Sequence, residues 1–210
     1  MKITEFFDKT YCVNLDRRTD RWSEAMDEFN KFNLTEVERI SAVDGKTTPI
    51  QLKNRNTNVS EIALVLTNIK IIENAKQQGL KSILILEDDV EFTDEVNNIS
   101  EYFKFLPEDW DMIYFGGNHN THMRVSPPKI INEKVCKLHQ TYSTHCVGIR
   151  ETAYDTILDN LKDLTKQLDV VYSDLQKKLN VYSFYPMIAT QRVGYSDIQN
   201  KTVDYKWLIK

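Results

Sequence analysis

The sequence has little cysteine and no long apolar run. Its three cysteines, Cys12, Cys136 and Cys146, are odd in number and widely spaced, which argues against a disulfide scaffold, and they lack the spacing of a zinc site. No apolar stretch approaches the roughly 20 residues that span a bilayer. The first residues mix acids and bases and form no apolar signal core. We therefore expect a cytoplasmic protein without a transmembrane segment, for which peripheral membrane association stays open.

The chain also lacks an excess of basic charge. It has 27 lysines and arginines against 31 acids, a net charge of -4 at pH 7. Nucleic-acid binding usually leaves a basic footprint, so we expect no nucleic-acid partner. The rest of the composition, 41% hydrophobic and 28% charged over 210 residues, is typical of a globular protein with a sizeable core. No repeat or interior linker is visible, which predicts one domain over residues 1–210.

The most informative stretch is KSILILEDDVEF, residues 81–92, where four apolar residues run directly into Glu87, Asp88 and Asp89. An unbroken apolar run of this length is typical of a strand buried on both faces of a sheet. Ligands of open α/β sheets bind at the carboxyl ends of such strands. Alternation places Glu87 and Asp89 on one side, where they could share Mg²⁺ or Mn²⁺ with substrate phosphates. The alternative is a solvated loop after a core strand.

Hydrophobic periodicity predicts alternating strands and helices, a pattern typical of a mostly parallel α/β layer. The predicted strands are residues 10–15, 37–40, 81–86, 111–115, 135–139, 145–149 and 181–190. The predicted helices are residues 17–31, 60–78, 96–105, 154–164 and 169–179. Ser60 is the expected N-cap of the second helix, and Gly79 follows its C-terminus. Residues 118–128, without apolar periodicity, are expected to form a loop over a site.

Two further polar groups could do chemistry. The segment NLDRRTDR contains Asn14, Arg17, Arg18 and Arg21 where a strand passes into a helix, a position that favours anions such as nucleotide phosphates. The alternative is a salt-bridged helix surface. Asp169 begins a late helix, where it is either a general base or an N-cap.

Three other positions have a structural and a functional interpretation. Asp44 stands in an Asp-Gly turn signal. Ser196 and Asp197, in QRVGYSDI, either close a site or form a turn. His145 is either a core histidine or a group facing the same cleft as Glu87; the four histidines together do not form a zinc pattern.

Taken in order, five segments resemble glycosyltransferase family 25, the lipopolysaccharide-biosynthesis and collagen galactosyltransferase group. They are NLDRRTDRW, RISAVDGK, SEIALVLTNIKIIENAKQQGLKSILILEDDVEF, DWDMIYFGG and QRVGYSDI, and they extend from Asn14 to Ile198. The resemblance implies a GT-A fold, an α/β nucleotide-binding fold with a mostly parallel central sheet flanked by helices. It also implies metal-dependent, inverting transfer of galactose or glucose from a UDP-sugar to a hydroxyl of a glycan or protein acceptor.

The resemblance also assigns roles to individual residues. The acidic triplet corresponds to a DxD-like motif, with Asp89 on Mn²⁺ or Mg²⁺ and Glu87 toward the ribose or the metal. Asp169 resembles the base that deprotonates the acceptor. The positions expected to hold the nucleotide are Asn14, Arg17, Arg21, Asp44, Glu87 and Asp88.

The sequence departs from the family pattern in three places, and two other functions stay open. Ser60-Glu61 stands where Gly-Glu is usual. Thr67 and Asn68 stand where a Ser-His pair is usual, and Leu168 precedes Asp169 where Pro or Val is usual. A nucleotidyltransferase also uses acids at a strand end with a divalent metal, although the first strand lacks a Gly-rich phosphate loop. A transferase-like domain that binds a nucleotide or glycan without turnover is the other alternative.

Overall fold

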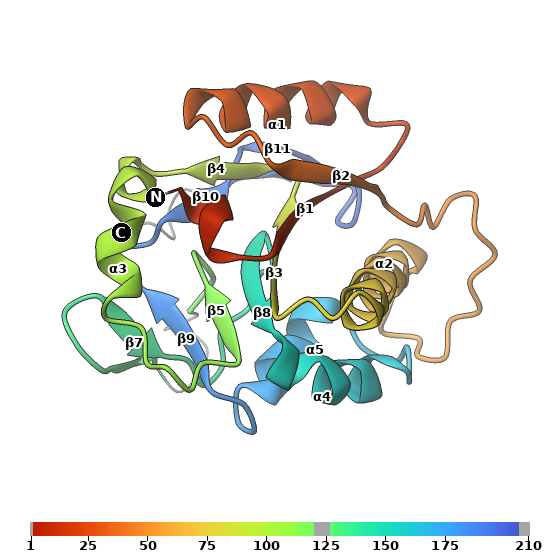
Figure 1. The fold of residues 1–210 in the computed structure, drawn as a ribbon. Helices are drawn as coiled ribbons and strands as arrows, with labels where there is room; N and C mark the ends of the chain where they lie inside the picture. Colours follow the sequence, from red (N-terminus) through yellow and green to blue (C-terminus); the bar gives the residue numbers. More distant parts are fainter. Residues whose placement is uncertain (1, 120–126, 206–210) are drawn as a thin grey trace.

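The computed structural model describes residues 2–119 and 127–205. Its centre is an eight-stranded sheet with the order β2-β1-β3-β8-β5-β9-β7-β6. The strands are β1 (Lys9–Asn14), β2 (Val37–Ser41), β3 (Ser82–Glu87), β5 (Met112–Tyr114), β6 (Lys129–Ile130), β7 (Val135–Lys137), β8 (Cys146–Arg150) and β9 (Val181–Phe184). Helices cover both faces of this sheet (Figure 1), which confirms the predicted α/β class.

The sheet is mixed, because two strands run against the others. β1 pairs in parallel with both β2 and β3, and β5 pairs in parallel with β9. β8 is antiparallel to both of its neighbours, β3 and β5, and β7 is antiparallel to β9 and β6. Six of the described strands therefore share one direction, but four of the seven neighbouring pairs are antiparallel, because the reversed strands β8 and β7 both lie inside the sheet.

Helices and short elements complete the described fold. The helices are α1 (Thr19–Lys31), α2 (Val59–Gln77), α3 (Ile99–Phe103), α4 (Glu151–Leu161) and α5 (Leu168–Leu175), with 3-10 helices η1 (Ile3–Phe6) and η2 (Asp94–Asn98). Two small antiparallel sheets pair β4 (Val90–Phe92) with β10 (Ala189–Gln191) and β11 (Gly194–Ser196) with β12 (Lys201–Val203). Helices α2, α4 and α5 lie on one face of the central sheet and α1 on the other (Figure 1).

Strand β3 contributes to both hydrophobic cores, as its unbroken apolar run predicts. Ile83 and Ile85 pack into the core under α2, α4 and α5. Leu84 and Leu86 point to the opposite face, into the core formed with α1 and α3. All four side chains are at most 4% exposed. Because a buried aliphatic side chain stabilises the fold by about 1.5–3 kcal/mol, this strand fixes the position of the acids that follow it.

Several local predictions need correction. Asn58, not Ser60, caps α2: its side chain accepts from the Glu61 amide over 3.0 Å, while the Glu61 carboxylate accepts from the Asn58 amide over 2.8 Å. Gly79 does follow the helix, with φ 69°. The helix expected over residues 96–105 is split into η2 and α3, and the strand expected over 181–190 is split into β9 and β10. Most of the expected loop 118–128, residues 120–126, lies outside the described residues.

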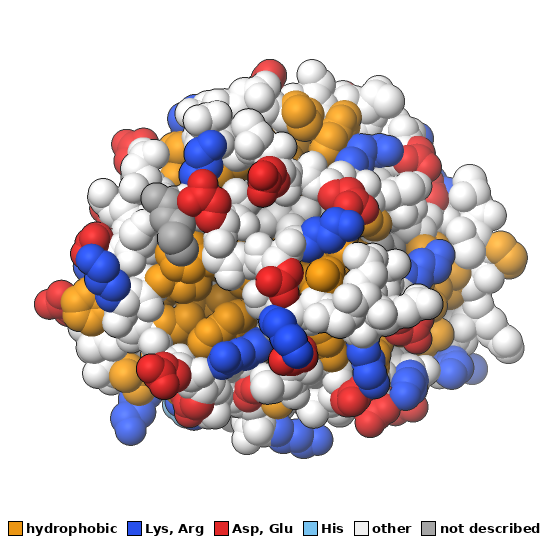
Figure 2. Space-filling model, in the orientation of Figure 1, with side chains coloured by type: hydrophobic (Ala, Val, Ile, Leu, Met, Phe, Trp, Pro, Cys, Tyr) orange, Lys and Arg blue, Asp and Glu red, His pale blue; other side chains and the backbone are white. Residues whose placement is uncertain are grey.

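On the face drawn in Figure 2, acidic and basic side chains are interspersed. This distribution agrees with the net charge of -4. Among the described helices, none has both the length and the apolar character needed to cross a membrane.

Candidate active site

A pocket of about 360 Å³ opens at the carboxyl ends of β1, β2 and β3. Its walls come from the residues that follow these strands, from the N-terminal turns of α2 and α5, and from the β11–β12 hairpin. This is the edge at which an α/β sheet binds ligands. Of the predicted site residues, the pocket lining includes Arg17, Arg21, Asp44, Glu87, Asp88, Asp89 and Asp169.

Among the six residues expected to hold the nucleotide, Asn14 alone does not line the pocket. It is 1% exposed at the end of β1. Its Nδ2 donates to Asp88 over 2.6 Å and to the Arg18 carbonyl over 3.1 Å, while its Oδ1 accepts two hydrogen bonds from Arg39. These bonds use the full hydrogen-bonding capacity of an amide side chain. Asn14 therefore orients Asp88 from behind the pocket wall.

Arg21, on the first turn of α1, is the cation beside the acidic triplet. Its Nη2 lies 2.5 Å from Oδ1 of Asp88 and 2.8 Å from Oδ2 of Asp89. Strand alternation, which placed Glu87 and Asp89 on one side and would place Asp88 on the other, does not extend past Glu87, because β3 ends there and residues 88–89 form a turn into β4. One guanidinium therefore contacts both carboxylates, and all three acids of the triplet line the pocket.

Two acids of the triplet, Glu87 and Asp88, have raised pKa values because both are desolvated. Burial, and secondly the charge of Asp89, raise the pKa of Glu87 to about 8 although Thr144 donates to its Oε1 over 2.7 Å. Burial raises the pKa of Asp88 to about 6, and the Arg21 charge opposes this shift. Closely spaced, desolvated carboxylates resist joint ionisation. A cation placed among them would relieve that conflict.

Asp89 has an oxygen suited to such a cation. Its Oδ1 is buried and has no hydrogen-bond partner among the described residues, whereas Gln191 approaches its Oδ2 at 3.5 Å. Carboxylate oxygens are the ligands that Mg²⁺ and Mn²⁺ prefer. In the described parts of the chain, no group of three or more His, Cys, Asp or Glu could hold a metal ion. The unpartnered Oδ1 of Asp89 is the feature of this site that fits a divalent cation, whose other ligands would have to include bound substrate and water.

Arg17 links the pocket to the C-terminal hairpin. Its Nε donates to Asp44 over 2.7 Å, and its Nη1 lies 2.8 Å from Asp197. Asp197 also pairs with Arg18. Burial alone would raise the pKa of Asp197, but the two guanidinium groups hold it below its usual value. The ion pairs of Asp197 thus hold the hairpin against the pocket. Asp44 forms the predicted turn and also pairs with Arg17.

Asp169 lies in the first turn of α5, and Gln167, not Asp169, is the N-cap residue. Burial raises the pKa of Asp169, although the backbone amides of Val170 and Ser143 donate to it. Ser143 has φ 72°, a left-handed conformation that few non-glycine residues adopt. The carboxylate therefore lines the pocket and is held by backbone hydrogen bonds.

His145 is a buried histidine outside the pocket lining. Its Nε2 lies 3.3 Å from the Ala189 carbonyl, and its Nδ1 has no partner among the residues that the structure describes. Burial lowers its pKa. Its place, close behind Asp89, matches the core interpretation more than a direct contact with a pocket ligand.

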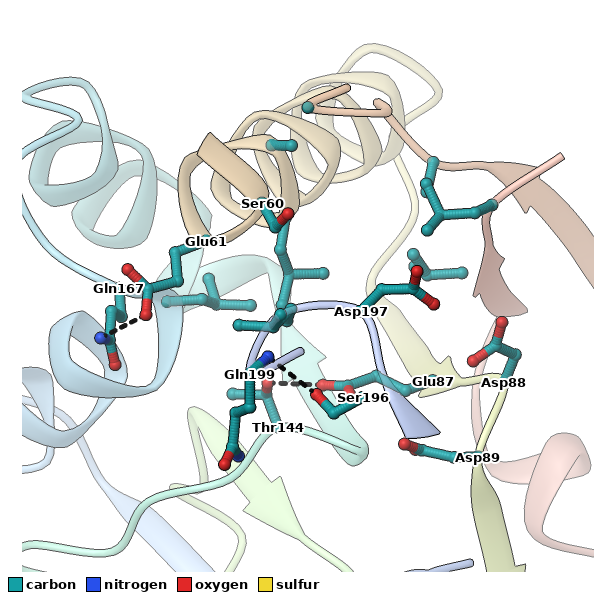
Figure 3. Close-up of a pocket in the computed structure, with 18 of the residues that line it drawn as sticks. Ser60, Glu61, Glu87, Asp88, Asp89, Thr144, Gln167, Ser196, Asp197 and Gln199 are labelled. Carbon is teal, nitrogen blue, oxygen red and sulfur yellow. Dashed lines mark hydrogen bonds between the residues drawn. The ribbon is translucent and has the colours of Figure 1, made fainter. Parts of the chain in front are cut away.

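Sequence reasoning missed the polar residues that complete the pocket. Glu61, Thr144 and Gln167 all line it, and Figure 3 shows Glu61 and Gln167 bonded to each other across from Asp88 and Asp89. The sequence alone identifies Glu61 only as an acid in the first turn of a helix. Its contact with Gln167, 106 residues away, has no local sequence signal.

The sequence matches the family described as "Glycosyltransferase family 25 (LPS biosynthesis protein)" over residues 7–162. No curated protein matches it. A solved glycosyltransferase involved in glycosylation of the major capsid of PBCV-1 is 12% identical, with a TM-score of 0.41, and covers 72% of this chain; this chain spans 64% of that one. A197 from STIV is 12% identical, with a TM-score of 0.44 and 93% of both chains covered. A UDP-glucose pyrophosphorylase complexed with UDP-glucose is 8% identical, with a TM-score of 0.43 and coverages of 84% and 72%. These structures are too distant to bear on function.

Proposed function

The chain belongs to glycosyltransferase family 25, and we propose that it transfers a hexose, galactose or glucose, from a UDP-sugar to a hydroxyl of a glycan or protein acceptor, with inversion at the anomeric carbon. The observation that carries the proposal is the convergence, in one pocket, of two arginines, the acidic triplet and a separately held carboxylate. A nucleotide-sugar transferase needs an anion grip, a means of stabilising the leaving diphosphate and a base.

The donor diphosphate is proposed to bind between Arg17 and Arg21. Both guanidinium groups line the pocket and are now neutralised by acids. Guanidinium groups favour phosphate oxygens through paired hydrogen bonds. A phosphate ligand would draw Arg17 from Asp197 and Arg21 from Asp89, which leaves Asp89 free to hold a cation.

Glu87 and Asp89 are the proposed protein ligands of Mn²⁺ or Mg²⁺. Their support is the unpartnered Oδ1 of Asp89 and the pair of desolvated carboxylates beside it. A bound divalent ion supplies positive charge where the departing UDP gains negative charge. Asp88, held by Asn14 and Arg21, keeps the turn between β3 and β4 in place for these two ligands.

Asp169 is the proposed general base. Its carboxylate takes the proton of the acceptor hydroxyl as that oxygen attacks the anomeric carbon, and the sugar–phosphate bond breaks on the opposite side. Its raised pKa brings it closer to the pH at which a base works well. The hairpin that carries Ser196 and Asp197 covers the pocket, and its cover is proposed to keep water from hydrolysing the donor.

The test is release of UDP from a panel of UDP-sugars, with and without Mn²⁺, in the presence of sugar acceptors, comparing the protein with its Asp89→Asn variant. The proposal predicts turnover of one or a few donors, strongly reduced in the variant. Release of pyrophosphate from a nucleoside triphosphate and a sugar phosphate would instead indicate a nucleotidyltransferase. Metal-dependent UDP binding without turnover of any donor would indicate a binding domain.

A further inference from the structure

The pocket has a second polar wall, away from the arginines. Glu61, Gln167 and Asp169 line this wall, and Figure 3 shows Glu61 and Gln167 on the opposite side of the pocket from Asp88 and Asp89. They come from the first turns of α2 and α5. The proposed nucleotide grip and the proposed base thus lie in different parts of one pocket, and Glu61 is a neighbour of the base.

Helix capping explains only half of the contacts of Glu61. Its Oε2 accepts from the Asn58 amide over 2.8 Å, as the third residue of a capping box does. Its Oε1 accepts from Nε2 of Gln167 over 2.6 Å. Gln167 is itself the N-cap residue of α5, yet its side chain makes no bond to that helix. The amide is instead directed across the pocket wall, where it orients the Glu61 carboxylate.

The two carboxyl groups of this wall, Glu61 and Asp169, indicate which kind of ligand can bind there. The ion pairs described for the arginines around the pocket join them to Asp20, Asp44, Asp88, Asp89 and Asp197, and none of these pairs includes Glu61 or Asp169. Carboxyl groups that lack a cationic partner are poor neighbours for a diphosphate and good acceptors for groups that donate hydrogen bonds. Each oxygen of Glu61 still has one lone pair to accept with. A neutral ligand that carries several hydroxyl groups meets these conditions.

We propose that Glu61, oriented by Gln167, binds a hydroxyl of a saccharide acceptor next to the hydroxyl that attacks, and so determines which acceptor is used. The inference rests on the proposed glycosyl transfer and on the assignment of Asp169 as base. The pocket then has two subsites. The acids and arginines at the strand ends bind the donor, and the first turns of α2 and α5 bind the acceptor.

Glu61→Gln separates this role from capping, because glutamine caps a helix in the same position but loses the negative charge. The assay is UDP release from UDP-galactose and UDP-glucose, with methyl glycosides of galactose, glucose and N-acetylglucosamine as acceptors. We expect the acceptor KM to rise about 10- to 100-fold, the range for losing a hydrogen bond to a charged group. The donor KM, acceptor-free donor hydrolysis and the unfolding temperature should stay unchanged.

Two variants frame the result. Gln167→Ala should raise the acceptor KM less, since it frees the Glu61 carboxylate without removing it. Glu73→Gln, an exposed position on the same helix, should leave all parameters unchanged.

Unaltered kinetics in Glu61→Gln would show that Glu61 acts only as a helix cap. A change in the donor KM alone would show that Glu61 contacts the donor and not the acceptor. Donor hydrolysis that no methyl glycoside stimulates would overturn the saccharide acceptor but leave transferase chemistry standing, whereas absence of any donor turnover would overturn the proposed function itself.

Discussion

Arg21 and Asp89 form a largely buried ion pair in the wall of the pocket, with 2.8 Å between Nη2 and Oδ2 and side-chain exposures of 14% and 18%. The same nitrogen contacts Asp88. One arginine therefore compensates two desolvated acids at the end of β3. This arrangement makes Arg21 part of the stability of the fold as well as of the proposed donor grip.

Replacing Arg21 with methionine keeps a long side chain but removes its charge. Breaking a buried pair leaves an uncompensated charge, which typically destabilises by 3–5 kcal/mol. We expect the free energy of unfolding of Arg21→Met to fall by about 3 kcal/mol in urea denaturation at pH 7. Lys104→Met, which breaks an exposed pair with Glu101, is the control and should cost less than about 1 kcal/mol. Equal losses in the two variants would contradict the importance of the buried pair.

The raised pKa of Glu87 predicts a pH dependence of stability. Its pKa is about 8 in the folded protein, because of burial and the Asp89 charge, against an ordinary value of 4.5. Between these values the native state keeps a proton that the unfolded chain has lost, so the free energy of unfolding must fall as pH rises. Denaturation at several pH values from about 5 to 8, without divalent ions, should show this slope.

Glu87→Gln should flatten that slope, because glutamine does not titrate. Glu36→Gln, at an exposed position, should leave the slope as it is in the unaltered protein. A Glu87→Gln variant with the same pH dependence as the unaltered protein would show that Glu87 titrates normally.

Gly116 permits a close approach between the end of β5 and the segment that precedes Gln191. A Cβ added at Gly116 would lie 1.8 Å from the Ala189 carbonyl oxygen. The backbone would have to move, so Gly116→Ala should lower the free energy of unfolding by about 1–3 kcal/mol. A Cβ at Gly194 meets nothing within 4 Å, so Gly194→Ala should stay within about 0.5 kcal/mol of the unaltered protein. Thermal unfolding of the two variants distinguishes them, and equal midpoints would contradict the packing described here.

Asp169→Asn tests the base. The substitution keeps the size of the side chain but cannot accept the acceptor proton, so kcat should fall about 10²- to 10⁴-fold. Binding of UDP, measured by calorimetry, should not change, because Asp169 lies apart from the proposed donor grip. Asp174→Asn, an exposed position on the same helix, is the matched control and should retain full activity. A kcat that is insensitive to Asp169→Asn would remove it from the mechanism.

Much of the site could be predicted because it is encoded locally. The apolar run from Ile83 to Leu86 predicts a doubly buried strand, and the acids after it had to emerge at the ligand-binding edge. The segment from Arg17 to Arg21 follows β1, whose neighbour in the sheet is β3. The sequence therefore indicates that guanidinium groups and carboxylates meet there, as they do in the structure.

Other features depend on contacts that no local pattern specifies. β8 is inserted antiparallel between β3 and β5, and hydrophobic periodicity carries no information about strand direction or neighbours. Alternation could not place Asp88 and Asp89, because the strand ends one residue before them. The contact between Glu61 and Gln167 joins two helix starts that are distant in sequence, so it emerges only from the tertiary packing.

The acids after β3 are proposed to bind a nucleotide sugar through a divalent cation. The most direct measurement is calorimetric titration of UDP into the protein with Mn²⁺ and, separately, with EDTA, repeated with Asp89→Asn. We expect UDP to bind only when Mn²⁺ is present, and the binding to be strongly weakened in the variant. Equal binding of UDP with Mn²⁺ and with EDTA would contradict the metal site, and no binding under either condition would contradict the donor pocket.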